Sequence, residues 1–217
     1  MNVKLTTITP DAEKTIVEIA RVSSSRKDKA AKPEALLKYL IANKHWSPFE
    51  HGHITFEIET SKAIGIQLIR HRSFTFQEFS QRYAVVDKIE PIELRQQATN
   101  NRQSSTEVFD PVLHDEDGFD TIVKVYASEA IAYHLEVAQR LYSSLLRAGV
   151  ARECARMVLP MATSTTIFMT GTIRSWIHFL DIRDDEHAQK EIRLIAKDIK
   201  AMMVEELPII SKALNWK

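Results

Sequence analysis

The sequence predicts an α+β fold in which a mainly antiparallel sheet is surrounded by helices, one of them long. Residues 54–58 alternate between apolar and polar side chains, which is typical of a half-buried strand. Residues 119–148 instead repeat apolar side chains at helical spacing. Strands and helices follow one another without a regular βαβ alternation, and no linker or internal repeat interrupts them. We therefore expect a single domain that spans residues 1–217.

Capping residues and apolar patterns define the expected elements of the first third of the chain. The prediction is a strand over 3–8, a helix capped by Asp11 that ends near Val22, a helix opened by Pro33, the strand over 54–58, and a helix from its N-cap Ser61 through Arg70. In this last helix Gln67, Arg70 and His71 would share one face, because residues three and four apart are neighbours on a helix. Its other positions are apolar, so we expect it to be buried.

A polar stretch separates the expected elements of the second half. Residues 89–94 are predicted to form a strand, which must lie at a sheet edge because Pro91 is within it, and residues 95–107 to form an exposed loop. The long helix follows over 119–148 and ends at Gly149. After it we expect a strand over 161–171, a short helix near Arg174, and a final helix from about Glu186. The apolar side chains of the final helix keep a helical period, which puts them on one face.

Composition excludes several classes of function. Lys plus Arg and Asp plus Glu number 29 each, so no net positive charge favours binding to nucleic acid. No apolar run is long enough to span a bilayer, and the N-terminus lacks the apolar core of a signal peptide. The five glycines lie far apart, so neither a P-loop nor a dinucleotide-binding fingerprint is present. We expect a cytoplasmic protein that contacts neither nucleic acid nor membrane.

Cys154 is the only cysteine, which excludes an internal disulfide and a zinc–thiolate cluster. The flanking Arg152 and Arg156 are neighbours of the kind that activate a nucleophilic thiol. No histidine lies close to Cys154 in the sequence, so we favour the alternative of a small buried side chain.

Residues 70–83 interleave three arginines and a histidine with three phenylalanines and a tyrosine. Arginine binds phosphate through two parallel hydrogen bonds and also stacks on rings, so the pattern favours an anionic aromatic ligand such as a nucleotide or a flavin nucleotide. A solvated basic face beside core aromatic residues is one alternative. An RNA-binding domain that stacks bases on Arg and Phe is another, which the neutral net charge disfavours.

Serine and histidine side chains offer two further candidate sites. Ser80 would need a paired base to act as a nucleophile, and no Gly-x-Ser-x-Gly elbow surrounds it, so a phosphate-binding turn beside Arg82 is favoured. His45, His51 and His53 would need additional ligands to hold a metal, and the chain has no His-Glu-x-x-His motif. We expect no metal site and interpret His51 and His53 as part of a polar strand face.

Several motifs resemble those of the flavin-dependent thymidylate synthases. The matching segments are Arg-His-Arg at 70–72 followed after seven residues by Ser80, with Glu78, Arg82 and Tyr83 around it; Ser-Pro-Phe-Glu-His at 47–51 after His45; Ala-Arg-Met-Val-Leu-Pro at 155–160; and 174–183 with His187 one turn on. The resemblance runs from about Ala20 to the last helix and leaves about 85–121 unmatched.

The resemblance implies an enzyme that reductively methylates dUMP to dTMP. Methylenetetrahydrofolate would supply the carbon, and FAD reduced by NADPH would supply the hydride. It also implies a homotetramer whose chains share active sites. The implied FAD contacts are His45, Ser47, Arg70, His71, Arg72, Ser73, Thr172, Arg174, His178 and His187. The implied dUMP contacts are Gln67, Glu78, Ser80, Gln81, Arg82, Arg156 and Arg183. Arg183 is also the implied catalytic residue, because its guanidinium would stabilise negative charge on the pyrimidine.

The chain departs from the family pattern at several positions. Gln77 and Thr172 stand where asparagine is common, and Thr75 stands where serine is common. Gln81 stands where glycine is frequent. If that turn needs a positive φ, glutamine would be strained there.

Two alternatives accompany the family interpretation. A non-catalytic module that binds flavin or nucleotide would need the Arg-His-Arg motif but could dispense with Arg183 and with the turn at 80–82. For Arg156, the alternative is an ordinary helix arginine paired with Glu153.

Overall fold

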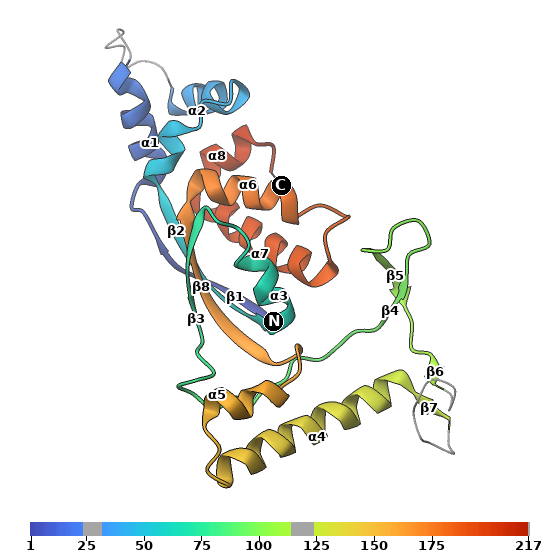
Figure 1. Cartoon of the computed structure of the whole chain (residues 1–217). Coiled ribbons are helices and arrows are strands. Elements are labelled where there is room, and N and C mark those ends of the chain that lie inside the picture. The colour runs from blue at the N-terminus through green and yellow to red at the C-terminus, as the bar shows by residue number, and fades with distance from the viewer. Residues whose placement is uncertain (24–31, 114–123, 217) are drawn as a thin grey trace. The chain divides into compact units, whose positions relative to one another are not determined.

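A computed structural model describes residues 1–23, 32–113 and 124–216 of the chain (Figure 1). Its contacts group the chain into two units. Unit 1 comprises Met1–Glu59, Ile66–Glu78 and Thr166–Lys217, and unit 2 comprises Thr60–Gly65 and Phe79–Thr165. The predicted α+β class is confirmed, with an antiparallel sheet and surrounding helices. The extent of a single domain over 1–217 stays a prediction.

A four-stranded sheet has the order β1-β2-β8-β3 (Figure 1). The strands are β1 (Asn2–Ile8), β2 (His53–Ser61), β3 (Phe74–Glu78) and β8 (Ser164–Thr172). β1 pairs antiparallel with β2, and β3 pairs antiparallel with β8. The predicted alternation in β2 is confirmed, because Ile54, Phe56 and Ile58 are each at most 1% exposed. The sheet therefore has one face that packs into the core.

Helices of unit 1 supply the rest of that core. They are α1 (Ala12–Ala20), α2 (Pro33–Ala42), α6 (Ile173–Arg183), α7 (Lys190–Glu206) and α8 (Pro208–Ala213), with short 3-10 turns η1 (Arg21–Ser23) and η2 (Ser47–His51). α7 packs against α6, β1 and α8. The predicted apolar face of the final helix is confirmed, since Ile192, Ile195, Ile199 and Met203 are buried. Trp176 of α6 is fully buried, and its ring N–H donates to the carbonyl oxygen of Ile54 at 3.1 Å.

Unit 2 is built around the long helix α4 (Ala127–Arg147). Its other elements are β4 (Arg95–Gln97), β5 (Ser105–Val108), β6 (Val112–Leu113), β7 (Val125–Tyr126), α5 (Arg152–Ala155) and η4 (Arg156–Val158). The predicted stop at Gly149 is confirmed by its φ of 85°, which a glycine adopts without strain. Tyr142 of α4 is fully buried and forms a small apolar core with Val86 and Ala155. The hydroxyl of Tyr142 also accepts the Val86 backbone N–H at 3.4 Å.

Several expected boundaries in the first half are wrong. Asp11 is the N-cap residue of α1 as predicted, but it has a left-handed φ of 49° and its side chain makes no capping hydrogen bond; the helix ends at Ala20, before Val22. Helix α3 (Lys62–Leu68) ends before Arg70, so Gln67, Arg70 and His71 do not share a helical face. The expected burial of that segment is wrong at Ile66 and Ile69, which are 39% and 41% exposed.

The second half shows differences of the same kind. Segment 89–94 forms a single bridge, Ile89 with Thr163, instead of a strand. The expected loop over 95–107 contains the hairpin of β4 and β5, whose exposed polar strands lack an apolar alternation. α4 begins at Ala127, so the expected helix is wrong at 124–126, where Val125 and Tyr126 form β7, and its residues 119–123 lie outside the described residues. β3 and α8 were not predicted. In the described residues, no helix is long and apolar enough to cross a membrane.

Candidate functional site

A cavity of about 570 Å³ opens in unit 1 between η2, the start of β3 and helix α6. It is lined by Lys44, Trp46, Glu50, Ser73, Thr172, Arg174, Ser175, Ile177, His178 and Asp181. Four of the ten residues expected to contact a cofactor therefore line it: Ser73, Thr172, Arg174 and His178. The aromatic ring of Trp46 and the cations of Lys44 and Arg174 are the side-chain chemistry that a flat, anionic ligand requires.

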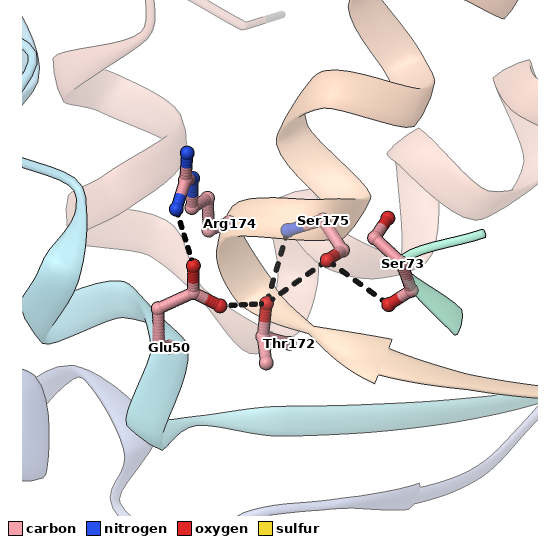
Figure 2. A network of polar contacts seen from close by, with 5 residues as sticks. All are labelled: Glu50, Ser73, Thr172, Arg174 and Ser175. Atoms are coloured by element: carbon pink, nitrogen blue, oxygen red, sulfur yellow. Dashed lines mark hydrogen bonds and ion pairs between the residues drawn. The ribbon is translucent and has the colours of Figure 1, made fainter. Parts of the chain in front are cut away.

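A hydrogen-bond network that includes Glu50 and Thr172 forms part of the cavity wall (Figure 2). One carboxylate oxygen of Glu50 pairs with Nη1 of Arg174, and the other accepts the Thr172 hydroxyl at 2.9 Å. The same Thr172 oxygen accepts the Ser175 backbone N–H at 3.1 Å, so Thr172 is the N-cap of α6. The Ser175 hydroxyl in turn donates to the Ser73 carbonyl oxygen at 3.3 Å. The network thus joins η2, the β8–α6 junction and the segment before β3.

Glu50 is ionised within this network. Partial burial works to raise the pKa of its carboxyl group, but the hydrogen bonds from Arg174 and Thr172 together outweigh burial and hold the pKa below its usual value. A negative carboxylate is therefore the state that orients Arg174 near neutral pH.

His71 and Arg183 form the second contact in unit 1. Nε of Arg183 donates to Nε2 of His71 at 3.0 Å. The imidazole packs edge-on against Phe179, with ring centroids 4.9 Å apart, and lies near Phe74. Burial, with Arg183 and His178 nearby, lowers the pKa of His71 to about 4, so the ring is neutral and can accept the hydrogen bond. Burial, with Arg70 nearby, also lowers the pKa of Arg183.

Gln67 belongs to a short relay of side chains at the start of α7. Its Nε2 donates to Oε1 of Gln189 at 2.6 Å, and Nε2 of Gln189 donates to the Glu191 carboxylate at 2.9 Å. His187 lies apart from this relay and pairs with Asp185, with Nδ1 and Oδ1 2.7 Å apart. The backbone and side-chain hydrogen bonds from His187 lower the pKa of Asp185.

The other predicted residues of unit 1 lie outside the lining of the cavity. His45 packs edge-on against Tyr39, with ring centroids 5.9 Å apart. Ser47, Arg70 and Arg72 are exposed. His51, expected on a strand face, lies in η2 instead.

The segment expected to bind phosphate forms a turn in unit 2. The Ser80 carbonyl oxygen accepts the backbone N–H groups of Tyr83 and Ala84 at 3.0 and 3.1 Å, and the Ser80 hydroxyl accepts that of Arg82 at 3.4 Å. Gln81 is buried, and it is not one of the three described non-glycine residues that have a positive φ. The glutamine therefore fits this turn without the strain that a left-handed conformation would impose.

Unit 2 also offers hydrogen-bond donors from two of its arginines, Arg82 in this turn and Arg156 in η4. Arg82 pairs with Glu153 at 3.2 Å, and both side chains are more than half exposed. Glu153 thus contacts Arg82, rather than Arg156 as the alternative interpretation expected. Nε of Arg156 is buried and has no hydrogen-bond partner among the described residues. A buried donor of this kind costs free energy unless a ligand satisfies it, so Arg156 is suited to bind an anion.

The remaining candidate sites find less support. Cys154 is exposed, so its expected role as a small buried side chain is wrong. Across residues 1–23, 32–113 and 124–216, no group of three His, Cys, Asp or Glu side chains could hold a metal ion.

Sequence reasoning missed four side chains that hold predicted site residues in place: Glu50, Ser175, Asp185 and Gln189. Glu50 was within reach of that reasoning, because it lies inside the Ser-Pro-Phe-Glu-His motif. The others contact residues through the fold or through a loop, and the sequence carries no signal for such contacts.

Comparisons with known proteins agree on one family. Residues 4–209 match the family model described as "Thymidylate synthase complementing protein". The chain is 42% identical over 207 residues to the "Probable flavin-dependent thymidylate synthase" of Paramecium bursaria Chlorella virus 1, covering 94% of this chain and 91% of the relative. It is 40% identical over 201 residues to the "Flavin-dependent thymidylate synthase" of Synechocystis sp., covering 93% and 88%.

A solved structure is similar over nearly the whole chain. This is the UMP/dUMP methylase PolB from Streptomyces cacaoi, bound with 5-Br dUMP. The two structures agree with a TM-score of 0.79 and 27% sequence identity, over 99% of this chain and 94% of the other.

Proposed function

This chain belongs to the thymidylate synthase complementing protein family of flavin-dependent thymidylate synthases, and from that premise we propose its substrates and the roles of its residues. The proposed reaction is the reductive methylation of dUMP to dTMP. Methylenetetrahydrofolate donates the carbon, NADPH is the reductant, and FAD is the flavin. The observation that carries the proposal is the Arg183–His71 hydrogen bond, because it fixes a cationic fork beside the Arg-His-Arg motif.

The cavity of unit 1 is the proposed FAD site. Its volume of about 570 Å³ lies within the range of small-molecule sites, roughly 300–1,000 Å³. Arg174 would bind the phosphates, Trp46 offers a flat ring, and Ser73, Thr172 and His178 offer polar groups at the wall. His45, Ser47, Arg70, His71, Arg72 and His187 complete the proposed set of flavin contacts. When bound, the reduced flavin supplies the hydride, while the chain supplies binding and orientation.

The Ser80–Ala84 turn is the proposed site for the dUMP phosphate. The Ser80 hydroxyl, which accepts the Arg82 backbone N–H and can still donate its own proton, and the guanidinium of Arg82 are donors that an anion needs. The buried, unpartnered Nε of Arg156 supports a second anion contact. Gln67, Glu78 and Gln81 are proposed to bind the rest of the nucleotide.

Arg183 is the proposed catalytic residue. Its guanidinium would stabilise negative charge that develops on the pyrimidine ring. Neutral His71 accepts from Nε, so the other N–H donors of Arg183 remain available for the substrate. Burial, with the Arg70 cation nearby, lowers the pKa of Arg183, and a second cation near Arg183 also favours an anionic ligand.

A homotetramer with shared active sites is proposed for the active form. On α4, Tyr133, Val137 and Leu141 follow one another at helical spacing and are 67%, 37% and 47% exposed. A row of exposed apolar side chains on one helix face is typical of a protein–protein interface. A mass in solution of four times the chain mass of 24.9 kDa, measured by light scattering, would support the tetramer, and the mass of a single chain would contradict it.

The absorbance spectrum of FAD-loaded protein tests the proposed ligands. After desalting, the protein should retain a flavin spectrum, and adding dUMP should shift that spectrum because the proposed reaction requires the pyrimidine close to the flavin. Protein that stays colourless after loading would contradict the proposal. Retained flavin with no response to dUMP, and no turnover, would instead favour the non-catalytic flavin-binding module.

A further inference from the structure

Glu50 contacts two cavity-lining groups at the start of α6, the Thr172 hydroxyl and the Arg174 guanidinium. It comes from η2, whereas Thr172 and Arg174 come from the β8–α6 junction (Figure 2). Both of its carboxylate oxygens are used, one by Nη1 of Arg174 and one by the Thr172 hydroxyl. The Ser-Pro-Phe-Glu-His segment therefore reaches the cavity through Glu50.

The directions of these hydrogen bonds are fixed by chemistry. An ionised carboxylate only accepts, so Arg174 and Thr172 must donate to it. The Thr172 oxygen is then free to accept the Ser175 N–H and cap α6. Arg174 uses Nη1 for Glu50, and its side chain is 51% exposed at the cavity wall. Its remaining N–H donors are available to a ligand.

We propose that Glu50 is a positioning residue for the phosphate groups of the flavin nucleotide, because it holds the guanidinium of Arg174 so that the remaining donors serve the cavity. This inference rests on the proposed function. It also predicts the direction in which FAD affinity changes when the Glu50 carboxylate is removed. By charge alone, a carboxylate near the site repels an anion, so its removal should tighten binding. If Glu50 positions Arg174, its removal weakens binding instead.

Flavin titrations of the full chain measure the direction of this change in FAD affinity. Glu50→Gln keeps the shape of the side chain but removes its charge, and we expect it to weaken FAD binding about tenfold. Riboflavin has no phosphate, so its affinity should change by less than about twofold. Glu50→Asp keeps the carboxylate and should lose less FAD affinity than Glu50→Gln. Glu18→Gln, which neutralises an exposed carboxylate on α1, is the matched control and should leave FAD affinity unchanged.

A double-mutant cycle with Arg174→Ala separates positioning from support of the fold. If Glu50 acts through Arg174, then Glu50→Gln should have less than about a twofold effect on FAD affinity once Arg174 is alanine. An equal loss in both backgrounds, or an equal loss for FAD and riboflavin, would assign Glu50 a structural role and overturn the proposal. Tighter or unchanged FAD binding by Glu50→Gln would also overturn it.

The wild-type titration keeps the two levels of inference apart. If the wild-type protein binds FAD and Glu50→Gln binds it equally well, only the role of Glu50 fails. If the wild-type protein binds no FAD, the proposed function fails and the role of Glu50 fails with it. Should Glu50→Gln not fold, Glu50→Asp in the same cycle gives the test, because its shorter side chain weakens the contact with Arg174 while keeping the charge.

Discussion

Arg183, at the end of α6, donates a hydrogen bond from Nε to Nε2 of His71, which follows α3. The two residues are 112 positions apart in the chain, so the fold alone brings them together. The contact requires a neutral imidazole, and burial, with Arg183 and His178 nearby, provides one by lowering the pKa of His71 to about 4. Protonation of His71 would remove the acceptor and put a second cation beside Arg183.

The first prediction is a pH-dependent free energy of unfolding. His71 titrates near 4 in the folded protein and near 6.5 when unfolded, so between these values the unfolded chain binds the extra proton. The contribution of His71 to the free energy of unfolding is therefore complete above about pH 6.5 and is lost as the pH falls toward 4. Because the ring is only partly buried, we expect a loss of about 1 kcal/mol between about pH 7 and pH 5.

Urea unfolding of the wild-type protein and of His71→Gln measures this loss. Other groups titrate equally in both proteins, so their contributions cancel in the comparison. The variant should lose about 1 kcal/mol less than the wild-type protein over the same pH interval. An identical pH dependence in the two proteins would show that His71 does not titrate as described.

The second prediction concerns Arg183. Arg183→Ala should lower kcat by about 10²–10³-fold, because it removes donors that stabilise charge in the transition state. FAD affinity should stay within about threefold, since Arg183 does not line the flavin cavity. Arg183→Lys is the control, because it keeps the charge but loses the planar fork. Full activity of Arg183→Ala would exclude the proposed catalytic role.

The third prediction concerns the packing of Gly171 against Phe74. These residues are paired across β3 and β8, and a Cβ at Gly171 would lie 2.4 Å from Cδ1 of Phe74. The ring has little freedom to move, because its centroid is 4.6 Å from that of Trp176. Gly171→Ala should therefore lower the free energy of unfolding by about 1–3 kcal/mol in urea titrations.

Gly149→Asn is the matched control for Gly171→Ala. Gly149 has φ 85° with nothing near its Cβ position, and asparagine tolerates this conformation better than most residues. It should cost less stability than Gly171→Ala. The reverse order would contradict the account of Phe74 packing.

The fourth prediction concerns Arg82, which pairs with Glu153 on the surface of unit 2. Exposed ion pairs contribute at most about 1 kcal/mol, so Arg82→Ala should scarcely change stability. A charge-assisted phosphate contact is worth about 1.5–3 kcal/mol, so dUMP affinity should fall by roughly 10–100-fold. Isothermal titration with dUMP measures the change. Glu153→Gln breaks the same pair but keeps Arg82, and an equal loss of affinity there would contradict a direct role for Arg82.

The sequence predicted elements where a local pattern decides the structure. The alternation of Ile54, Phe56 and Ile58 gave β2, and Gly149 gave the end of α4. The hairpin of β4 and β5 was missed because its strands are exposed and polar, so no apolar face marks them. β3 also has an alternation, with Phe74 and Phe76 more buried than their neighbours. It was missed because charged residues flank it, and the whole segment was interpreted only as a ligand-binding stretch.

The candidate site divides in the same way. Arg174 and the turn at Ser80 carry recognisable chemistry, and the motifs identified them. The partners that orient them come from other segments: Glu50 lies 124 residues from Arg174 in the chain. Such contacts depend on tertiary packing, which no local pattern encodes. For the same reason, the end of α3 before Arg70 and the exposure of Cys154 were not predictable.

Product analysis is the most direct test of the proposed reaction. Purified protein is incubated with dUMP, methylenetetrahydrofolate, NADPH and FAD, and dTMP is measured by liquid chromatography with mass detection. We expect dTMP to form, and its formation to stop when methylenetetrahydrofolate or NADPH is omitted or when FAD is stripped from the protein. Protein that binds FAD and is reduced by NADPH, yet forms no dTMP with all components present, would contradict the proposed reaction.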